Sequence, residues 1–168
     1  MNAPAPHPVR RDQALAMWRD YTASLATPPD DDEPVAEQFG DSAAMADELT
    51  ELVVAGTKRA TADLAAAFAA DREPLPRIGA HWIVCDSSGA PRCVVRSVEL
   101  RLGPMSSVDD AFASDEGEGD RTRASWLAEH QRFFRRIHQA LGLAWSDDCE
   151  VLFERFRVVW PPDLADDQ

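Results

Sequence analysis

The sequence predicts a single α+β domain, in which helices are segregated from a small and largely antiparallel sheet. Three segments carry apolar residues at helical spacing, and three others are short runs rich in β-branched residues. The helical segments lie near residues 12–25, 42–55 and 121–141, and the strand-like runs lie within residues 75–86, 92–102 and 149–160. A chain of 168 residues with 45% hydrophobic content is long enough for one well-buried core and short for two.

The domain is expected to span residues 12–160, between two tails. Residues 1–11 are rich in proline and alanine without periodicity, which predicts a disordered tail, and residues 161–168 form the second tail. The first helix begins at Asp12, and the segment TPPDDDEP at 27–34 ends it, because prolines and a charge run cannot continue a helix.

A second helix is expected between a polar cap and a glycine. Asp41 or Ser42 is a suitable N-cap, and Gly56 stands where a left-handed residue commonly ends a helix. The alanine-rich run at 64–71 then predicts a short helix. The end of the second helix at Gly56 is followed at once by the sequence TKRAT, which contains Lys58 and Thr61.

The second half of the chain supplies the sheet and the longest helix. A turn feeds a strand within 75–86, and the run 92–102 is long enough for a central strand. A capped short helix and an acidic, glycine-containing loop occupy 106–120. We expect the helix from about Arg121 to pack on the sheet. The expected core residues are Trp82, Val84, Val94, Val95 and Phe153.

The charge pattern bears on possible partners. The formal net charge is -13, so the field of the whole protein repels polyanions. Residues 28–55 hold nine acidic and no basic residues, whereas residues 56–101 hold seven basic and five acidic ones. This basic segment leaves room for a small positive pocket. It would suit a small nucleoside or a short single-stranded RNA, and we expect no binding to duplex DNA.

Several familiar sites are missing from the sequence. AGTK lacks the first glycine of a phosphate-binding loop, and no G-x-S-x-G motif is present. The four histidines have no metal-ligand spacing, and His130 is read as a buried core histidine. We therefore predict no metal and no cofactor. Three cysteines without a C-x-x-C pair, and no apolar run of signal-peptide or membrane-span length, favour a cytoplasmic protein that does not enter a membrane.

One constellation can carry chemistry. Lys58 and Thr61 are three residues apart, so one short unit can aim an amine and a hydroxyl at one point. Glu116 and Glu118 lie among glycines in a later loop, and a carboxylate from it would complete a set of base, nucleophile and acid. Taken singly, Lys58 is equally a capping charge and each glutamate a solvated acid.

Four blocks in order resemble the ASCH domain, in particular its bacterial stand-alone branch. They are FGDSAAMADELTELVVAGTKRATADL, LPRIGAHWIVCDSSGAPRCVVRSVEL, FASDEGEGDRTRASWLAEHQRFF and EVLFERFRVV. The resemblance implies a PUA-like β-barrel of mostly antiparallel strands with packed helices. It also implies a cleft lined by Gly56, Lys58 and Thr61. In one branch of the family a lysine, a threonine and a glutamate hydrolyse the exocyclic amide of acetylcytidine, and these residues match Lys58, Thr61 and Glu116.

The resemblance leaves three functions open. As an amidohydrolase, the protein would use a neutral Lys58, favoured by burial or by nearby Arg59 or Arg96, to accept a proton from Thr61 or water. Trp82 could stack on the base, and Glu118 would bind substrate or replace Glu116 as the acid. Alternatively, the protein is a binding module for RNA or a nucleotide, gripping phosphate with Lys58, Arg59 and Arg96. A metal-dependent ribonuclease using Asp115, Glu116 and Glu118 is the third reading. Lys58 is expected to be exposed or half-exposed, so Lys58→Ala should leave the fold intact.

Overall fold

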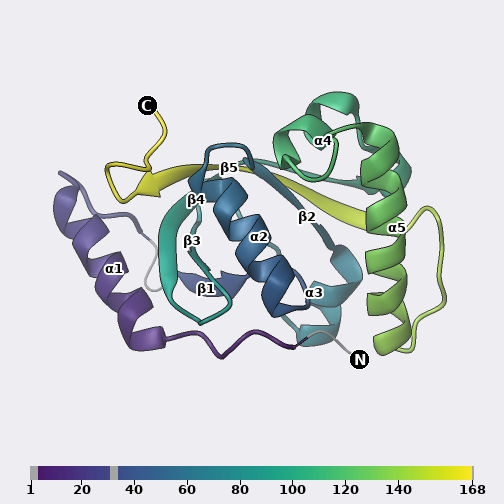
Figure 1. The fold of residues 1–168 in the computed structure, drawn as a ribbon, viewed down its shortest axis with the longest axis horizontal. Helices are drawn as coiled ribbons and strands as arrows, with labels where there is room; N and C mark the ends of the chain where they lie inside the picture. The colour runs from purple at the N-terminus through teal and green to yellow at the C-terminus, as the bar shows by residue number, and fades with distance from the viewer. Residues whose placement is uncertain (1–3, 31–33, 168) are drawn as a thin grey trace. The chain divides into compact units, whose positions relative to one another are not determined.

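The computed structural model describes residues 4–30 and 34–167, and these residues form a mixed α+β fold (Figure 1). Within them the elements run in the order α1 (Arg11–Ser24), β1 (Val35–Gln38), α2 (Ala43–Val54), β2 (Ala60–Leu64), α3 (Ala65–Asp71), β3 (His81–Cys85), β4 (Pro91–Pro104), a 3-10 turn (Met105–Ser107), α4 (Asp110–Glu116), α5 (Arg123–Ala140) and β5 (Glu150–Trp160). The strands form one sheet in the order β1-β3-β4-β5-β2. β3 pairs with β4 and β2 with β5 in antiparallel fashion, whereas β1 pairs with β3 in parallel. The predicted α+β class is confirmed.

The chain divides into two compact units, and β4 and β5 each contribute to both. The first unit comprises residues up to 57, residues 79–97 and the chain from residue 156. In it, α1 packs Trp18 and Tyr21 against Ile83 of β3. A second cluster joins Val53 of α2 to Val95 and other buried side chains of the strands. The unit is therefore held together by helices packed on β3 and the first half of β4.

The ends of α2 follow the expected chemistry. The hydroxyl of Ser42 accepts a hydrogen bond from the backbone N–H of Met45, which satisfies one donor of the first turn. Gly56 has a φ of 83°, and the N–H groups of Gly56 and Thr57 donate to the carbonyls of Val53 and Leu52. This pair of bonds is the Schellman motif, which needs a left-handed residue that glycine adopts without steric cost. The chain thus leaves α2 sharply, two residues before Lys58.

The second unit comprises residues 58–78 and 98–155. Alternate residues of β2 (Ala60, Ala62 and Leu64) are buried, as the period of two in a strand requires. They join a core that includes Phe153 of β5 and Trp126 and Phe134 of α5. α4 contacts both α5 and β2, as Figure 1 also shows for α4 and α5. The long helix therefore packs on the sheet, as predicted.

Two strands were not expected, and the remaining predictions are mostly met. β1 has only four residues and β2 has the sequence ATADL, so neither has a strong local strand signal. Val84, Val94, Val95 and Phe153 are buried and Trp82 is half-buried, in line with the expected core.

The expected tails lie partly outside the described residues, which exclude 1–3, 31–33 and 168. Residues 4–10 have no helix or strand, and the N–H groups of His7 and Arg10 donate to the carbonyls of Ser87 and Gly89. The helix break at 27–34 also includes the undescribed residues 31–33, and α1 ends before it at Ser24. The domain boundaries at 12 and 160 stay a prediction.

Candidate acid–base site

Lys58 is fully buried, which makes the expectation of an exposed or half-exposed lysine wrong. Its Nζ lies 2.6 Å from Oε1 of Glu118 and 3.8 Å from Oε1 of Glu116. Nζ also lies 3.5 Å from the main-chain carbonyl of Glu116. Carboxylates supply the compensation that a buried ammonium needs. The burial of Lys58 is therefore explained by its ion pairs with carboxylates. Lys58 is not a surface charge that caps a helix.

Local backbone structure brings these groups together. Glu116 is the last residue of α4, and Gly117 ends that helix with a φ of 77°. The chain turns there, which brings the carboxyl group of Glu118 into contact with Lys58. The N–H of Arg59 donates to the carbonyl of Asp115 at 2.7 Å, so the segment before β2 is fastened to the end of α4. The spacing of Lys58 and the two glutamates is thus set by backbone contacts.

The carboxyl group of Glu116 is held by two aromatic residues of α5. The indole Nε1 of Trp126 donates to Oε2 of Glu116, and Nε2 of His130 lies 3.3 Å from Oε1. The His130 ring stacks on Trp126 with centroids 3.8 Å apart. Glu116 itself is nearly fully buried. Both of its oxygens are therefore engaged by fixed groups.

Thr61, Asp63 and Glu154 lie on the other side of the β2–β5 pair from the buried alanines. Thr61 stands opposite Glu154 in the register, and Asp63 follows Thr61 by two residues on the same face. Thr61 is half-buried, and its hydroxyl forms no hydrogen bond with the described residues, Lys58 included. No buried polar atom of a described side chain lacks a partner, so this hydroxyl is open to water.

Two groups near Lys58 have shifted pKa values. The pKa of Asp63 is raised from 3.8 to about 6. The largest cause is loss of hydration, and the charges of Glu154 and Glu116 add to it. The side chain of Asp63 is nevertheless exposed to solvent. Burial lowers the pKa of His130, but the charge of Glu116 and the hydrogen bond to it outweigh burial, and the net shift is upward. We call Lys58, Asp63, Glu116, Glu118, Trp126 and His130 the Lys58 cluster.

The other predicted substrate-binding residues have different surroundings. Arg59 is half-buried and donates from Nη1 to the carbonyl of Lys58 at 2.8 Å. Trp82 and Arg96 belong to the first compact unit, where Trp82 contacts Phe39 and Phe156 edge-to-face and Arg96 is exposed. Their roles in binding stay predictions. The charges described next to the Lys58 ammonium are carboxylates, not the cations expected to favour its neutral form.

Sequence reasoning did not find the roles of Trp126, His130, Asp63 and Glu154. His130 is buried and hydrogen-bonded, as predicted, but its partner is a carboxylate of the candidate site. The available signal was the spacing of Trp126 and His130, which places two side chains with ring nitrogens on one helical face. Asp63 gave a weaker signal, because a residue two positions after Thr61 shares its face only if the segment is a strand.

A metal site of the kind considered for a ribonuclease does not form within the described residues, where no three His, Cys, Asp or Glu side chains are grouped as ligands. Asp115 is instead bound to Arg155, whose Nε lies 2.8 Å from Oδ2. Arg155 also binds Glu99 at 2.6 Å. The donor set Asp115, Glu116 and Glu118 is therefore divided between two cations.

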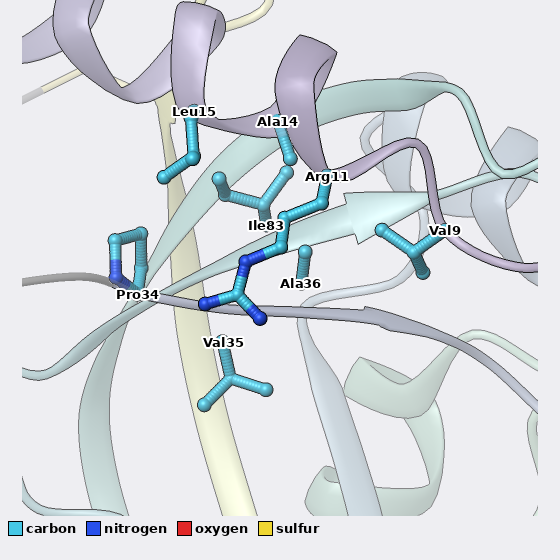
Figure 2. Close-up of a pocket in the computed structure, with 8 residues that line it drawn as sticks. All are labelled: Val9, Arg11, Ala14, Leu15, Pro34, Val35, Ala36 and Ile83. Carbon is cyan, nitrogen blue, oxygen red and sulfur yellow. The ribbon is translucent and has the colours of Figure 1, made fainter.

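A cavity of about 400 Å³ lies elsewhere, in the first unit between α1, β1 and β3 (Figure 2). The described residues that line it are Val9, Arg11, Ala14, Leu15, Pro34, Val35, Ala36 and Ile83. They include one cation and no carboxyl, thiol or imidazole group. Figure 2 shows the guanidinium of Arg11 lying across this apolar lining. The cavity lacks acid–base groups, so we do not assign it to the candidate site.

The fold and the Lys58 cluster together define an α+β protein whose buried lysine is held by carboxyl groups at a helix end. Residues 35–160 match the model of the ASCH domain, so the chain belongs to the ASCH domain family. The resemblance seen in the sequence is thereby confirmed.

Two solved structures are similar over most of the chain. The ASCH domain from Lactobacillus crispatus JV V101 is 25% identical with a TM-score of 0.81, over 89% of this chain and 96% of that one. Protein EF3133 from Enterococcus faecalis V583 is 28% identical with a TM-score of 0.81, over 88% of each chain. No curated protein matches the sequence. No helix in the described parts of the chain is both long and apolar enough to cross a membrane.

Proposed function

We propose that the protein is a cytoplasmic amidohydrolase that removes the acyl group from the exocyclic nitrogen of an acylated cytidine. The observation that carries the proposal is the contact of a fully buried lysine with two carboxyl groups, 2.6 and 3.8 Å away. Such a group of proton donors and acceptors is suited to amide hydrolysis, which needs a base for the nucleophile and an acid for the leaving amine. Membership of the ASCH family supports the choice of a nucleoside.

The contact of Lys58 with Glu118 offers a route to a neutral amine. At 2.6 Å the proton can pass from the ammonium to the carboxylate, which gives an amine and a carboxylic acid. The amine then takes one proton from a water molecule, whose oxygen bonds to the acyl carbon. When the C–N bond breaks, its electron pair stays on the exocyclic nitrogen, which takes a proton from Glu116. Glu116 therefore has to enter this cycle as the carboxylic acid. Lys58 then passes this proton to Glu116 and takes back its own proton from Glu118, which restores the site. The products are a carboxylic acid and the free exocyclic amine.

Thr61 and Asp63 would meet the substrate from β2. The hydroxyl of Thr61 is open to water, so it can hold the attacking water or a polar edge of the base. Of Lys58 and its two carboxyl partners, Glu118 is the one that solvent reaches. Its side chain is 30% accessible, whereas Lys58 and Glu116 are buried. Substrate would therefore approach along Glu118 and β2.

The charge at the site favours an uncharged ligand over a phosphate. Four carboxyl groups (Asp63, Glu116, Glu118 and Glu154) face one lysine and one histidine. A phosphate placed among them would be repelled, and the ammonium of Lys58 is already bound by carboxylates. This balance supports a free nucleoside and weighs against a module that grips RNA phosphates with Lys58.

Two matched variants test the assignment of the acid. Hydrolysis of N4-acetylcytidine is followed by chromatography for wild type, Glu116→Gln and Glu118→Gln. We expect Glu116→Gln to lower kcat/KM by about 100- to 10,000-fold, because the amide cannot supply the proton to the leaving nitrogen. Glu118→Gln should retain more activity. The reverse order would assign the acid to Glu118, and a wild-type protein without turnover would reject the amidohydrolase in favour of a binding module.

A further inference from the structure

His130 occupies an unusual position in the Lys58 cluster, because each of its ring nitrogens faces an oxygen. Nδ1 lies 3.0 Å from the main-chain carbonyl of Trp126, one turn earlier in α5. Nε2 lies 3.3 Å from Oε1 of Glu116. Both contacts are buried. The hydrogen-bonding capacity of these four atoms therefore limits where protons can be.

A carbonyl oxygen only accepts, so the Nδ1 contact requires a hydrogen on Nδ1. In a neutral imidazole the lone pair of Nε2 would then face a carboxylate oxygen, and two acceptors would meet in a buried site. The contact becomes favourable with one more proton, either as imidazolium with carboxylate or as imidazole with carboxylic acid. The geometry thus calls for a proton shared between His130 and Glu116.

We propose that His130 is a positioning residue that shares one extra proton with Glu116 and so keeps Glu116 supplied with the proton it gives to the leaving amine. This inference rests on the proposed function for the use of the proton, but not for its presence. Trp126 contributes by donating to the other oxygen of Glu116, which fixes the carboxyl group against the His130 ring. Proton transfer between Nε2 and Oε1 then needs no side-chain movement.

The charges around His130 are compatible with this arrangement. Glu116 at the end of α4 and Glu118 in the following loop favour the cationic ring, and so does Asp63 on β2 when ionised. Lys58 opposes it, but its ammonium contacts Glu118 at 2.6 Å. Glu154 on β5 acts on Asp63. On α5 itself, the carbonyl of Trp126 accepts from Nδ1.

His138 provides a matched control on the same helix. It is buried, and its Nδ1 lies 3.0 Å from the carbonyl of Phe134, one turn earlier. Within the described residues its ring has no carboxylate contact, and its other ring neighbour is Trp145. His130 and His138 therefore differ in the one contact that requires the shared proton.

The test is an NMR titration of the histidine rings in the unliganded protein, for wild type and Glu116→Gln. We expect the titration midpoint of His130 to lie above the value of about 6.5 for a free imidazole. In Glu116→Gln it should fall, because the amide carries no charge. The ring signals of His138, which has no carboxylate contact in the described residues, serve as the control. A His130 midpoint at or below 6.5, or one that Glu116→Gln leaves unchanged, would overturn the shared proton.

A second variant tests the use of the proton. His130→Gln retains a hydrogen-bond donor toward Glu116 but cannot carry a proton to it. We expect the alkaline limb of the pH profile of kcat on N4-acetylcytidine to move to lower pH in His130→Gln, with KM changed less than kcat. An identical pH profile would leave His130 a purely structural residue. If wild type shows no turnover, the proposed function fails, whereas the NMR titration still decides whether the proton is shared.

Discussion

A buried ammonium group is stable in a folded protein only when anions replace its lost hydration. Lys58 meets this condition through Glu116 and Glu118, and Glu116 in turn is held by Trp126 and His130. Removing the cation would leave two carboxylates facing each other in the protein. The lysine that was expected to tolerate truncation is therefore a structural as well as a candidate functional residue.

Lys58→Met keeps most of the side-chain volume and removes the charge. We expect it to lower the free energy of unfolding by about 3 kcal/mol, the lower end for breaking a buried ion pair, because Glu118 is partly hydrated. Urea unfolding monitored by circular dichroism measures the change. The double variant Lys58→Met/Glu118→Gln should recover part of the loss, since it removes the uncompensated carboxylate. A single variant as stable as wild type would contradict the ion network.

In β2, which pairs with β5, successive side chains point to opposite faces of the sheet, and only one of these faces is in the core. Ala60, Ala62 and Leu64 enter the core, while Thr61 and Asp63 share the opposite face with Glu154. A slip of one residue in the β2–β5 register would exchange these faces. The register thus puts Thr61 on the same face as Asp63 of the Lys58 cluster, and it keeps the alanines in the core with Trp126 and Phe134 of α5.

Asp63→Asn should stabilise the protein in a pH-dependent way. Because the pKa of Asp63 is about 6 in the folded protein and 3.8 in the reference state, the folded state binds more protons between these values. The contribution of Asp63 to wild-type stability therefore falls as the pH rises from 3.8 to 6. The variant is neutral throughout, so its gain in melting temperature should be absent near pH 3.8 and complete above pH 6. Thermal unfolding across this range measures it.

Asp120→Asn supplies a control of opposite sign. Hydrogen bonds from the hydroxyl and N–H of Thr122 hold the pKa of Asp120 below its ordinary value. The charged form is thus favoured in the folded protein, and its contribution is present at neutral pH and lost in acid. Asp120→Asn should therefore lose stability where Asp63→Asn gains it. The same sign of change in both variants would reject the electrostatic account.

Across the whole molecule, net charge sets the long-range field. At -13 the protein repels nucleic acid backbones, and the carboxyl groups around Lys58 add to this repulsion locally. We expect no change in fluorescence anisotropy when the protein is added to a labelled random duplex at about 0.15 M salt. A short single strand of the same length serves for comparison. Strong, salt-sensitive binding of the duplex would contradict the prediction.

Local pattern was sufficient for most elements of the fold. Helical spacing predicted α1, α2 and α5, and capping chemistry predicted that α2 begins at Asp41 or Ser42, of which the structure shows Ser42, and ends near Gly56. Runs rich in β-branched residues predicted β3, β4 and β5. β1 and β2 were missed, because a four-residue strand and the sequence ATADL acquire their conformation from pairing with β3 and β5.

For the candidate site, too, the sequence predicted some features and left others undetermined. The residue types and spacing in the chain were enough to single out Lys58, Thr61, Glu116 and Glu118, and to indicate the family. The chain alone did not reveal that Lys58 is buried or that His130 faces Glu116. Nor did it place Asp63 on a face with Glu154. Burial and contact between residues distant in sequence depend on how β2, α4 and α5 pack, and packing is a property of many residues together. The pKa shifts of Asp63 and His130 follow from those contacts, so they too depend on the folded structure.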